Sequence, residues 1–155
     1  MKTFLIAVAT AALAMTLPAL AEQPADVIRI TQEADITFVP SKTTPGLAQA
    51  VLLGDPSVPG QVYVVRNKFS PGTFSLPHFH PEARYIQVLK GTWWLGSGPV
   101  QDLAKTTPVK AGGFVVHHPG KIHWDGAKDE ETVIQITGIG PSGTTRVDET
   151  GQAKK

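Results

Sequence analysis

The sequence contains no cysteine and carries almost no net charge. The absence of cysteine excludes disulfides, thiol nucleophiles, iron–sulfur clusters and zinc sites built on thiolates. Its 14 basic and 13 acidic residues leave a net charge of +1, which offers no basic surface for nucleic acid. The 15 glycines and 13 prolines among 155 residues interrupt helices too often for a helical bundle. A single, turn-rich, mainly β domain is the class that remains.

Long apolar runs are also lacking, except for one at the start of the chain. Met1 and Lys2 precede an uncharged, mainly apolar stretch over residues 4–17, and small residues follow at Ala19 and Ala21. This order is typical of a secretory signal peptide over residues 1–21, cleaved after Ala21. An uncleaved membrane anchor is the alternative, but the run is short for a span of about 20 residues. We expect a secreted or periplasmic protein with no membrane contact after cleavage.

The rest of the chain has the pattern of short β-strands separated by turns. Glycine and proline interrupt it at roughly 8–12-residue intervals, which favours a sandwich or barrel of about eight to ten strands. The expected strands cover residues 35–39, 61–69, 74–80, 84–90, 92–96, 113–118, 132–139 and 144–147, and another begins at 122. The strands 84–90 and 92–96 are expected to form a hairpin around Gly91. Residues 47–53 fit either a strand or a short helix, and 102–105 fit one helical turn.

The five histidines form the pattern that indicates chemistry. His78 and His80 are two positions apart on an expected strand, so they share a face and can bind one metal ion. His123 follows a Pro-Gly turn, and a barrel would bring its strand beside the first. His117 and His118 are adjacent and therefore face opposite ways. Each of these two is expected at the surface or in support of the metal ligands.

The spacing of these residues resembles the two motifs of the cupin superfamily. The first motif runs glycine, five residues, His-X-His, three or four residues, glutamate, six residues and glycine. The matching positions are Gly72, His78, His80, Arg84 and Gly91. The second motif is matched by Gly113, Pro119, Gly120 and His123, with the usual Pro-X-Gly shortened to Pro-Gly. The chain is most similar to the small, exported, single-domain bacterial cupins.

The resemblance implies an all-β fold, a small antiparallel β-barrel or double-stranded β-helix of the RmlC-like jelly-roll type. On this basis we expect an N-terminal arm and edge strand over residues 22–45, a cupin domain over 46–148 and a flexible tail over 149–155. The resemblance also implies that His78, His80 and His123 bind one divalent transition metal at the barrel mouth. The candidate metals are iron, zinc, manganese, nickel and copper. Imidazole ligands suit iron, zinc, nickel and copper, and the sequence does not choose among the candidates.

Arg84 stands where the family has its glutamate ligand, and a guanidinium has no lone pair to donate. Three arrangements are therefore open. The site has three histidine ligands, with Arg84 turned aside or positioning an anionic group of the substrate. Alternatively, Glu82 supplies the carboxylate after a local bulge. In the third arrangement the metal is lost, and the pocket binds an anion through Arg84 and the histidines.

Strand alternation predicts which neighbouring side chains line the pocket. If position 84 faces inward, Ile86 and Val88 face inward too, whereas Tyr85, Gln87 and Leu89 face outward. Trp93 and Trp94 must face opposite ways, so one of them is expected to line the barrel. Trp124 is expected at the rim or in the core, and Gln135 would orient a bound water or ligand if it pointed inward.

The sequence supports three classes of function. The first is a metal-dependent enzyme of the oxygenase, isomerase or hydrolase type acting on a small molecule, with Arg84 and Glu82 as further catalytic candidates. The second is a binding module that holds a metal or ligand without turnover. The third is a cupin with a degenerate site that assembles as a homodimer, in which residues 22–35 add to a neighbour's sheet. No nucleic-acid partner is expected.

Overall fold

The computed structural model describes residues 28–154 of the chain. The expected signal peptide over residues 1–21 lies outside the described residues. The chain divides into two units, Met1–Ile30 and Thr31–Lys155, and the second holds all the strands that the structure describes. In the described part, no helix is long and apolar enough to cross a membrane.

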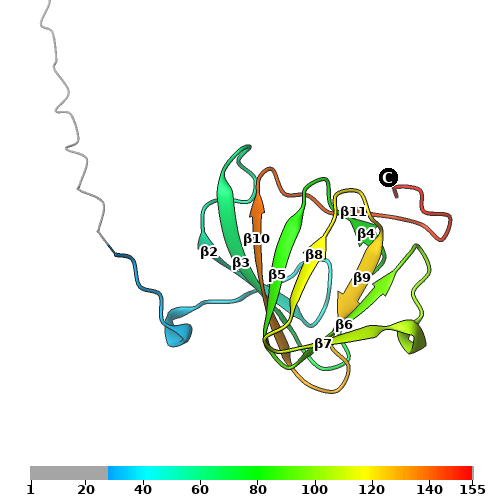
Figure 1. Cartoon of the computed structure of the whole chain (residues 1–155), viewed down its shortest axis with the longest axis horizontal. Helices are drawn as coiled ribbons and strands as arrows, with labels where there is room; N and C mark the ends of the chain where they lie inside the picture. Colours follow the sequence, from blue (N-terminus) through cyan, green and yellow to red (C-terminus); the bar gives the residue numbers. More distant parts are fainter. Residues whose placement is uncertain (1–27, 155) are drawn as a thin grey trace, which may run out of the picture. The chain divides into compact units, whose positions relative to one another are not determined.

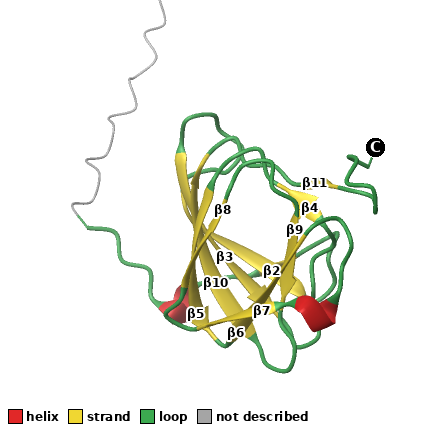
Figure 2. Ribbon diagram, turned by 45° about the vertical axis from the view of Figure 1, so that its right-hand side comes forward, coloured by secondary structure: helices red, strands yellow, loops and turns green. Residues whose placement is uncertain are grey.

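The second unit is built from short antiparallel strands in two sheets (Figure 1). The strands are β1 (Val39–Pro40), β2 (Leu47–Leu53), β3 (Val62–Phe69), β4 (His78–Phe79), β5 (Arg84–Lys90), β6 (Thr92–Ser97), β7 (Thr107–Lys110), β8 (Phe114–His117), β9 (His123–Gly126), β10 (Thr132–Ile139) and β11 (Thr145–Arg146). One sheet has the order β1-β2-β3-β10-β5-β8, and the other has the order β11-β4-β9-β6-β7. Within residues 28–154 the helical content is limited to two single turns, η1 (Glu33–Asp35) and η2 (Leu103–Lys105), which Figure 2 draws in red. The predicted all-β double-stranded β-helix is confirmed.

The core lies between the inner faces of the two sheets. Along β10 buried and partly buried residues alternate, with Ile134 and Ile136 on the buried face. The same alternation holds on β5, where Ile86 and Val88 are buried and Tyr85 is exposed, as predicted. The buried core cluster consists of Tyr63, Val65, Phe69, Ile86, Val88, Trp93, Ala127, Ile134 and Ile136. Burying apolar side chains on one face of each strand is what fixes the register of these pairs.

The expected hairpin around Gly91 is wrong. Strand β5 pairs with β10 and β8, whereas β6 pairs with β7 and β9 in the other sheet. Gly91 has φ +72°, and a Cβ there would clash with the carbonyl oxygen of Glu131. The tight glycine turn therefore carries the chain from one sheet to the other.

Two other expected strands are shorter than the pattern predicted. Residues 35–39 contribute only Val39 to β1, because the amides of Asp35 and Ile36 bond back to Gln32 and Glu33 in a single helical turn. Residues 74–80 form a strand only at His78–Phe79, since Pro77 and Pro81 flank it and have no amide N–H to donate. The ambiguous segment 47–53 is the strand β2, and the helical turn expected at 102–105 is η2.

The last residues fold back on the barrel. Val147 and Ala153 form an isolated β-bridge, and the Lys154 amide donates to the Arg146 carbonyl at 2.8 Å. The Asp148 carboxylate accepts hydrogen bonds from the amides of Thr150 and Gln152. The domain bounds given above stay a prediction.

Candidate metal centre

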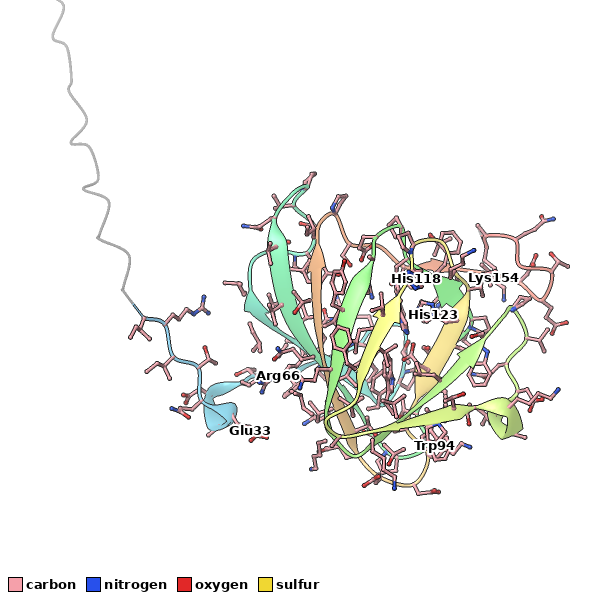
Figure 3. The ribbon with its side chains drawn as sticks, viewed as in Figure 1. Glu33, Arg66, Trp94, His118, His123 and Lys154 are labelled. Atoms are coloured by element: carbon pink, nitrogen blue, oxygen red, sulfur yellow. The ribbon has the colours of Figure 1, made fainter. Side chains whose placement is uncertain are left out.

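The three predicted ligands come together on the five-stranded sheet. His78 on β4 pairs in register with His123 on β9, which is labelled in Figure 3. His80 follows two residues after His78. Each offers a ligand atom, and these atoms lie within 4.8 Å of one another. All three side chains are buried. The i, i+2 spacing and the β4–β9 pairing thus produce the cluster that the sequence predicted.

Backbone carbonyls fix the tautomer of all three rings. In each ring Nδ1 lies within hydrogen-bonding distance of a carbonyl oxygen, which can only accept. The acceptors are Leu76 for His78 at 2.7 Å, Gly143 for His80 at 2.7 Å and Lys121 for His123 at 2.9 Å. Because Nδ1 then carries the proton, each Nε2 keeps a lone pair for a metal, which is how metal-binding histidines are held in proteins.

The spacing of these nitrogens fits a transition-metal ion. The Nε2 atoms of His78 and His80 are 3.2 Å apart. Two nitrogens about 2.1 Å from one ion would be about 3.0 Å apart at a right angle and about 3.4 Å apart at a tetrahedral angle. Nε2 of His123 is buried without a hydrogen-bond partner among residues 28–154. A divalent ion would satisfy all three lone pairs together.

Burial favours the neutral imidazole of His80 and of His123, which is the form that binds metal. Desolvation, followed by the charge of Arg84, lowers the pKa of His80 to about 2. Desolvation also lowers the pKa of His123 from its ordinary value of 6.5, against the opposing effect of Asp125.

The hydrogen bonds of Arg84 go to groups other than the three histidines. Its Nε donates to Glu82 Oε1 at 2.9 Å, and its Nη2 donates to Ser142 Oγ at 2.6 Å and to the Gly143 carbonyl at 3.2 Å. Gly143 is also the acceptor for Nδ1 of His80, so Arg84 contacts the residue that orients this ligand. The first of the three arrangements derived from the sequence allows this geometry, and it stays a prediction.

The Glu82 carboxylate bonds to Arg84 and not to the histidines. Besides the Arg84 guanidinium, its Oε1 accepts a hydrogen bond from the Tyr63 hydroxyl at 3.2 Å. Burial raises the pKa of the Glu82 carboxyl, but hydrogen bonding to Ser142 and the charge of Arg84 outweigh it, so the net pKa is lowered. Over the described residues, Glu82 belongs to no cluster whose geometry would hold a metal.

Two further residues lie beside the triad, His117 and Asp125, and only Asp125 was missed in the sequence. Of the two places expected for His117, the surface is wrong, because the side chain is only 9% exposed and its ring centroid lies 3.8 Å from that of His123. His118, labelled in Figure 3, is exposed. Asp125 is 6% exposed, and its Oδ2 lies 4.0 Å from Nε2 of His123. The i, i+2 rule could have found Asp125, two residues after His123. His117 stands opposite Arg84 in the β5–β8 pairing, which only the strand register reveals.

A cavity of about 540 Å³ opens beside these groups. Its polar lining includes His78, His80, Arg84, His117 and Asp125, and its apolar lining includes Phe69, Ile86, Trp93, Ile134 and Ile136. The cavity therefore joins a polar end to an apolar interior, as binding sites for small molecules commonly do.

The tryptophans and Gln135 are divided between the two faces of the sheets. Trp93 lines the cavity, while Trp94 faces the other way under Lys128, whose Nζ is 3.8 Å from the ring centroid. Trp124 is buried in contact with Phe74 and does not lie at the rim. Gln135 lies on the β10 face opposite Ile134 and Ile136 and accepts a hydrogen bond from Arg66, so it does not enter the pocket.

Neither the family models nor the curated proteins contain a match to this sequence. Solved structures do match. The polyketide cyclase RemF from Streptomyces resistomycificus is 18% identical, with a TM-score of 0.62 over 79% of this chain and 88% of that one. A cupin-2 domain from Rhodospirillum rubrum is 15% identical, with a TM-score of 0.62 over 80% and 82%. KdgF from a Halomonas species is 15% identical, with a TM-score of 0.53 over 70% and 91%. Together with the two antiparallel sheets, these likenesses show that the chain has the cupin fold.

Proposed function

We propose that the protein binds one divalent transition-metal ion through His78, His80 and His123 and acts on a small molecule held in the adjoining cavity. One observation carries the proposal: three buried imidazoles, each with Nδ1 bonded to a backbone carbonyl, present Nε2 atoms to one another. We further propose that it works in the periplasm or outside the cell after loss of residues 1–21.

The chemistry follows from the groups around the cavity. A bound ion with three histidine ligands would supply a Lewis acid with open positions for a substrate oxygen. Asp125 is the buried carboxylate that lines the cavity, so it is placed to take up or release a proton of the bound molecule. Arg84 lines the same cavity and is placed to position an anionic group, while Glu82 holds its guanidinium.

Enzymatic turnover is favoured over simple binding by the cavity itself. It combines two of the proposed metal ligands, His78 and His80, with a carboxylate and an apolar interior of substrate size. RemF, which shares the fold at low identity, is a polyketide cyclase. The absence of a carboxylate ligand at position 84 favours a second candidate function, a module that binds a ligand or metal without turnover.

The anion pocket without a metal is the weaker alternative. Without a metal, an anion would depend on Arg84, whose Nε and Nη2 are already bonded to Glu82, Ser142 and Gly143. Asp125 adds a further carboxylate to the cavity lining, which would repel an anion.

Metal content, measured by mass spectrometry on protein purified without a chelator or an affinity tag, tests the proposal. We expect about one ion per chain in the wild type and in His118→Ala, and none in His123→Ala. His118 is the matched control, because it is an exposed histidine near the same site. The absence of metal from the wild type after reconstitution would contradict the proposal.

Turnover is tested separately on the metal-loaded protein with a panel of esters, lactones and catechols. Product that forms with wild type and not with His123→Ala would support an enzyme. Saturable binding of a panel member without product would support the binding module instead.

A further inference from the structure

His123 belongs to two groups of metal-binding side chains. The first is the triad with His78 and His80, and the second joins it to His117 and Asp125. In each group the ligand atoms lie within 4.8 Å of one another. The ring centroids of His117 and His123 are only 3.8 Å apart, inclined at 45°.

Two side chains of the second group, His117 and His123, have buried ring nitrogens without a hydrogen-bond partner among the described residues. His117 is 91% buried, and neither ring nitrogen has a hydrogen-bond partner in the described part of the chain. Asp125 and His123 are not bonded to each other, since 4.0 Å between Oδ2 and Nε2 is too long for a hydrogen bond. Buried polar atoms that are left unsatisfied are rare and call for a ligand, ion or water.

We propose that His117, His123 and Asp125 form a second position for a divalent transition-metal ion in the same cavity. Two imidazole nitrogens and one carboxylate oxygen form a donor set that holds zinc or non-haem iron and leaves coordination positions open. Position 84 on β5, where the resemblance implies a glutamate ligand, is occupied by Arg84. In the second position, Asp125 on β9 provides the carboxylate instead.

The two positions are alternatives for one ion. Nδ1 of His123 donates to the Lys121 carbonyl, so the ring has a single free lone pair, at Nε2. That lone pair binds one ion at a time. An ion that moves from the triad to the second position exchanges His78 and His80 for His117 and Asp125.

Charge gives the second position one stabilising contribution that the triad lacks. An ion at the triad has three neutral ligands and shares the cavity with the cationic Arg84. At the second position the Asp125 carboxylate offsets one of its two charges, which matters because the surroundings are buried.

Cobalt(II) binding to the purified full chain, followed by absorption spectroscopy and calorimetry, tests this inference. The informative variant is His78→Ala/His80→Ala, which destroys the triad and leaves the second group complete. We expect this variant to bind one Co²⁺ per chain, about tenfold or more weakly than wild type and with a changed d–d spectrum. Adding Asp125→Asn or His117→Ala should abolish the remaining binding, and adding His118→Ala should not.

The outcomes separate this inference from the proposed function. If the folded His78→Ala/His80→Ala variant binds no Co²⁺ while wild type binds one, the triad stands and the second position is refuted. Binding that persists unchanged after Asp125→Asn and His117→Ala would also refute it. Native-like circular dichroism and thermal unfolding establish that each variant is folded. Asp125→Asn keeps the side-chain shape, and the backbone bond from residue 125 to Ser75 does not involve the carboxylate.

Discussion

The inward face of β5 is polar at its start and apolar farther along. Arg84 begins the strand beside the histidines, bonded to Glu82 and Ser142. Ile86 and Val88, two and four residues later on the same face, are each 1% exposed in the core. The barrel thus has two layers. Burial of the apolar layer stabilises the fold, and the polar layer is suited to binding. The two layers should respond differently to substitution.

The largest expected effect is on the apolar layer. Ile134→Ala should lower the free energy of unfolding by about 2–5 kcal/mol, because it removes a buried side chain and leaves a cavity. Metal content should not change. Urea denaturation measures the loss, and Ile139→Ala on the same strand, where the side chain is 56% exposed, is the control, with a change within about 0.5 kcal/mol. Loss of metal from a folded Ile134→Ala variant would contradict the prediction that the apolar layer affects stability and not metal binding.

A smaller effect is expected where the layers meet. Arg84→Met should cost about 1–3 kcal/mol of unfolding free energy, because it leaves the mostly buried Glu82 carboxylate without its cation. Glu82→Gln in the same chain should restore most of the loss, and the stoichiometry of metal binding should stay the same. Denaturation of the two single variants and the double variant gives the coupling energy. Additive losses would show that the pair does not act together.

The smallest effect expected for a single residue is a pH dependence confined to the polar layer. The pKa of both His80 and His117 is lowered to about 2, chiefly by desolvation, whereas an unfolded chain titrates near 6.5. The unfolded state therefore binds more protons below pH 6.5, and the stability of the metal-free protein should fall as the pH falls from 7 to 5. We expect about 1–2 kcal/mol for each histidine over this range.

His117→Gln should reduce this slope and His118→Ala should leave it unchanged. Glu82 does not interfere, because its lowered pKa contributes stability that is lost only as the pH falls below the ordinary value of 4.5. Guanidinium unfolding at several pH values, after treatment with a chelator, measures the effect. A stability that is flat between pH 7 and 5 would contradict it.

The apolar layer could be predicted from the sequence, because alternation places Ile86 and Val88 on one face whichever strands are their neighbours. The His-X-His spacing likewise predicted that His78 and His80 would meet, and the resemblance added His123. The hairpin at Gly91 could not be judged in this way. Both a hairpin and a crossing between sheets begin with a glycine turn, and only tertiary pairing distinguishes them.

The rest of the site depends on strand register. The i, i+2 rule would have placed Asp125 beside His123, but a lone carboxylate on an expected strand gives no other signal. Alternation alone could not decide whether His117 or His118 points inward. The inward position of His117 follows from its pairing with Arg84 across β5 and β8. The bonding of Arg84 to Ser142 and Gly143 joins segments far apart in the sequence, which no local pattern reveals.

The most direct test of the central claim is a crystal structure of the zinc-loaded protein with anomalous diffraction at the zinc edge. The account predicts an ion about 2.0–2.1 Å from Nε2 of His78, His80 and His123, with Arg84 still bonded to Glu82. An ion ligated by Glu82 with Arg84 displaced, or no anomalous peak near these histidines, would contradict it.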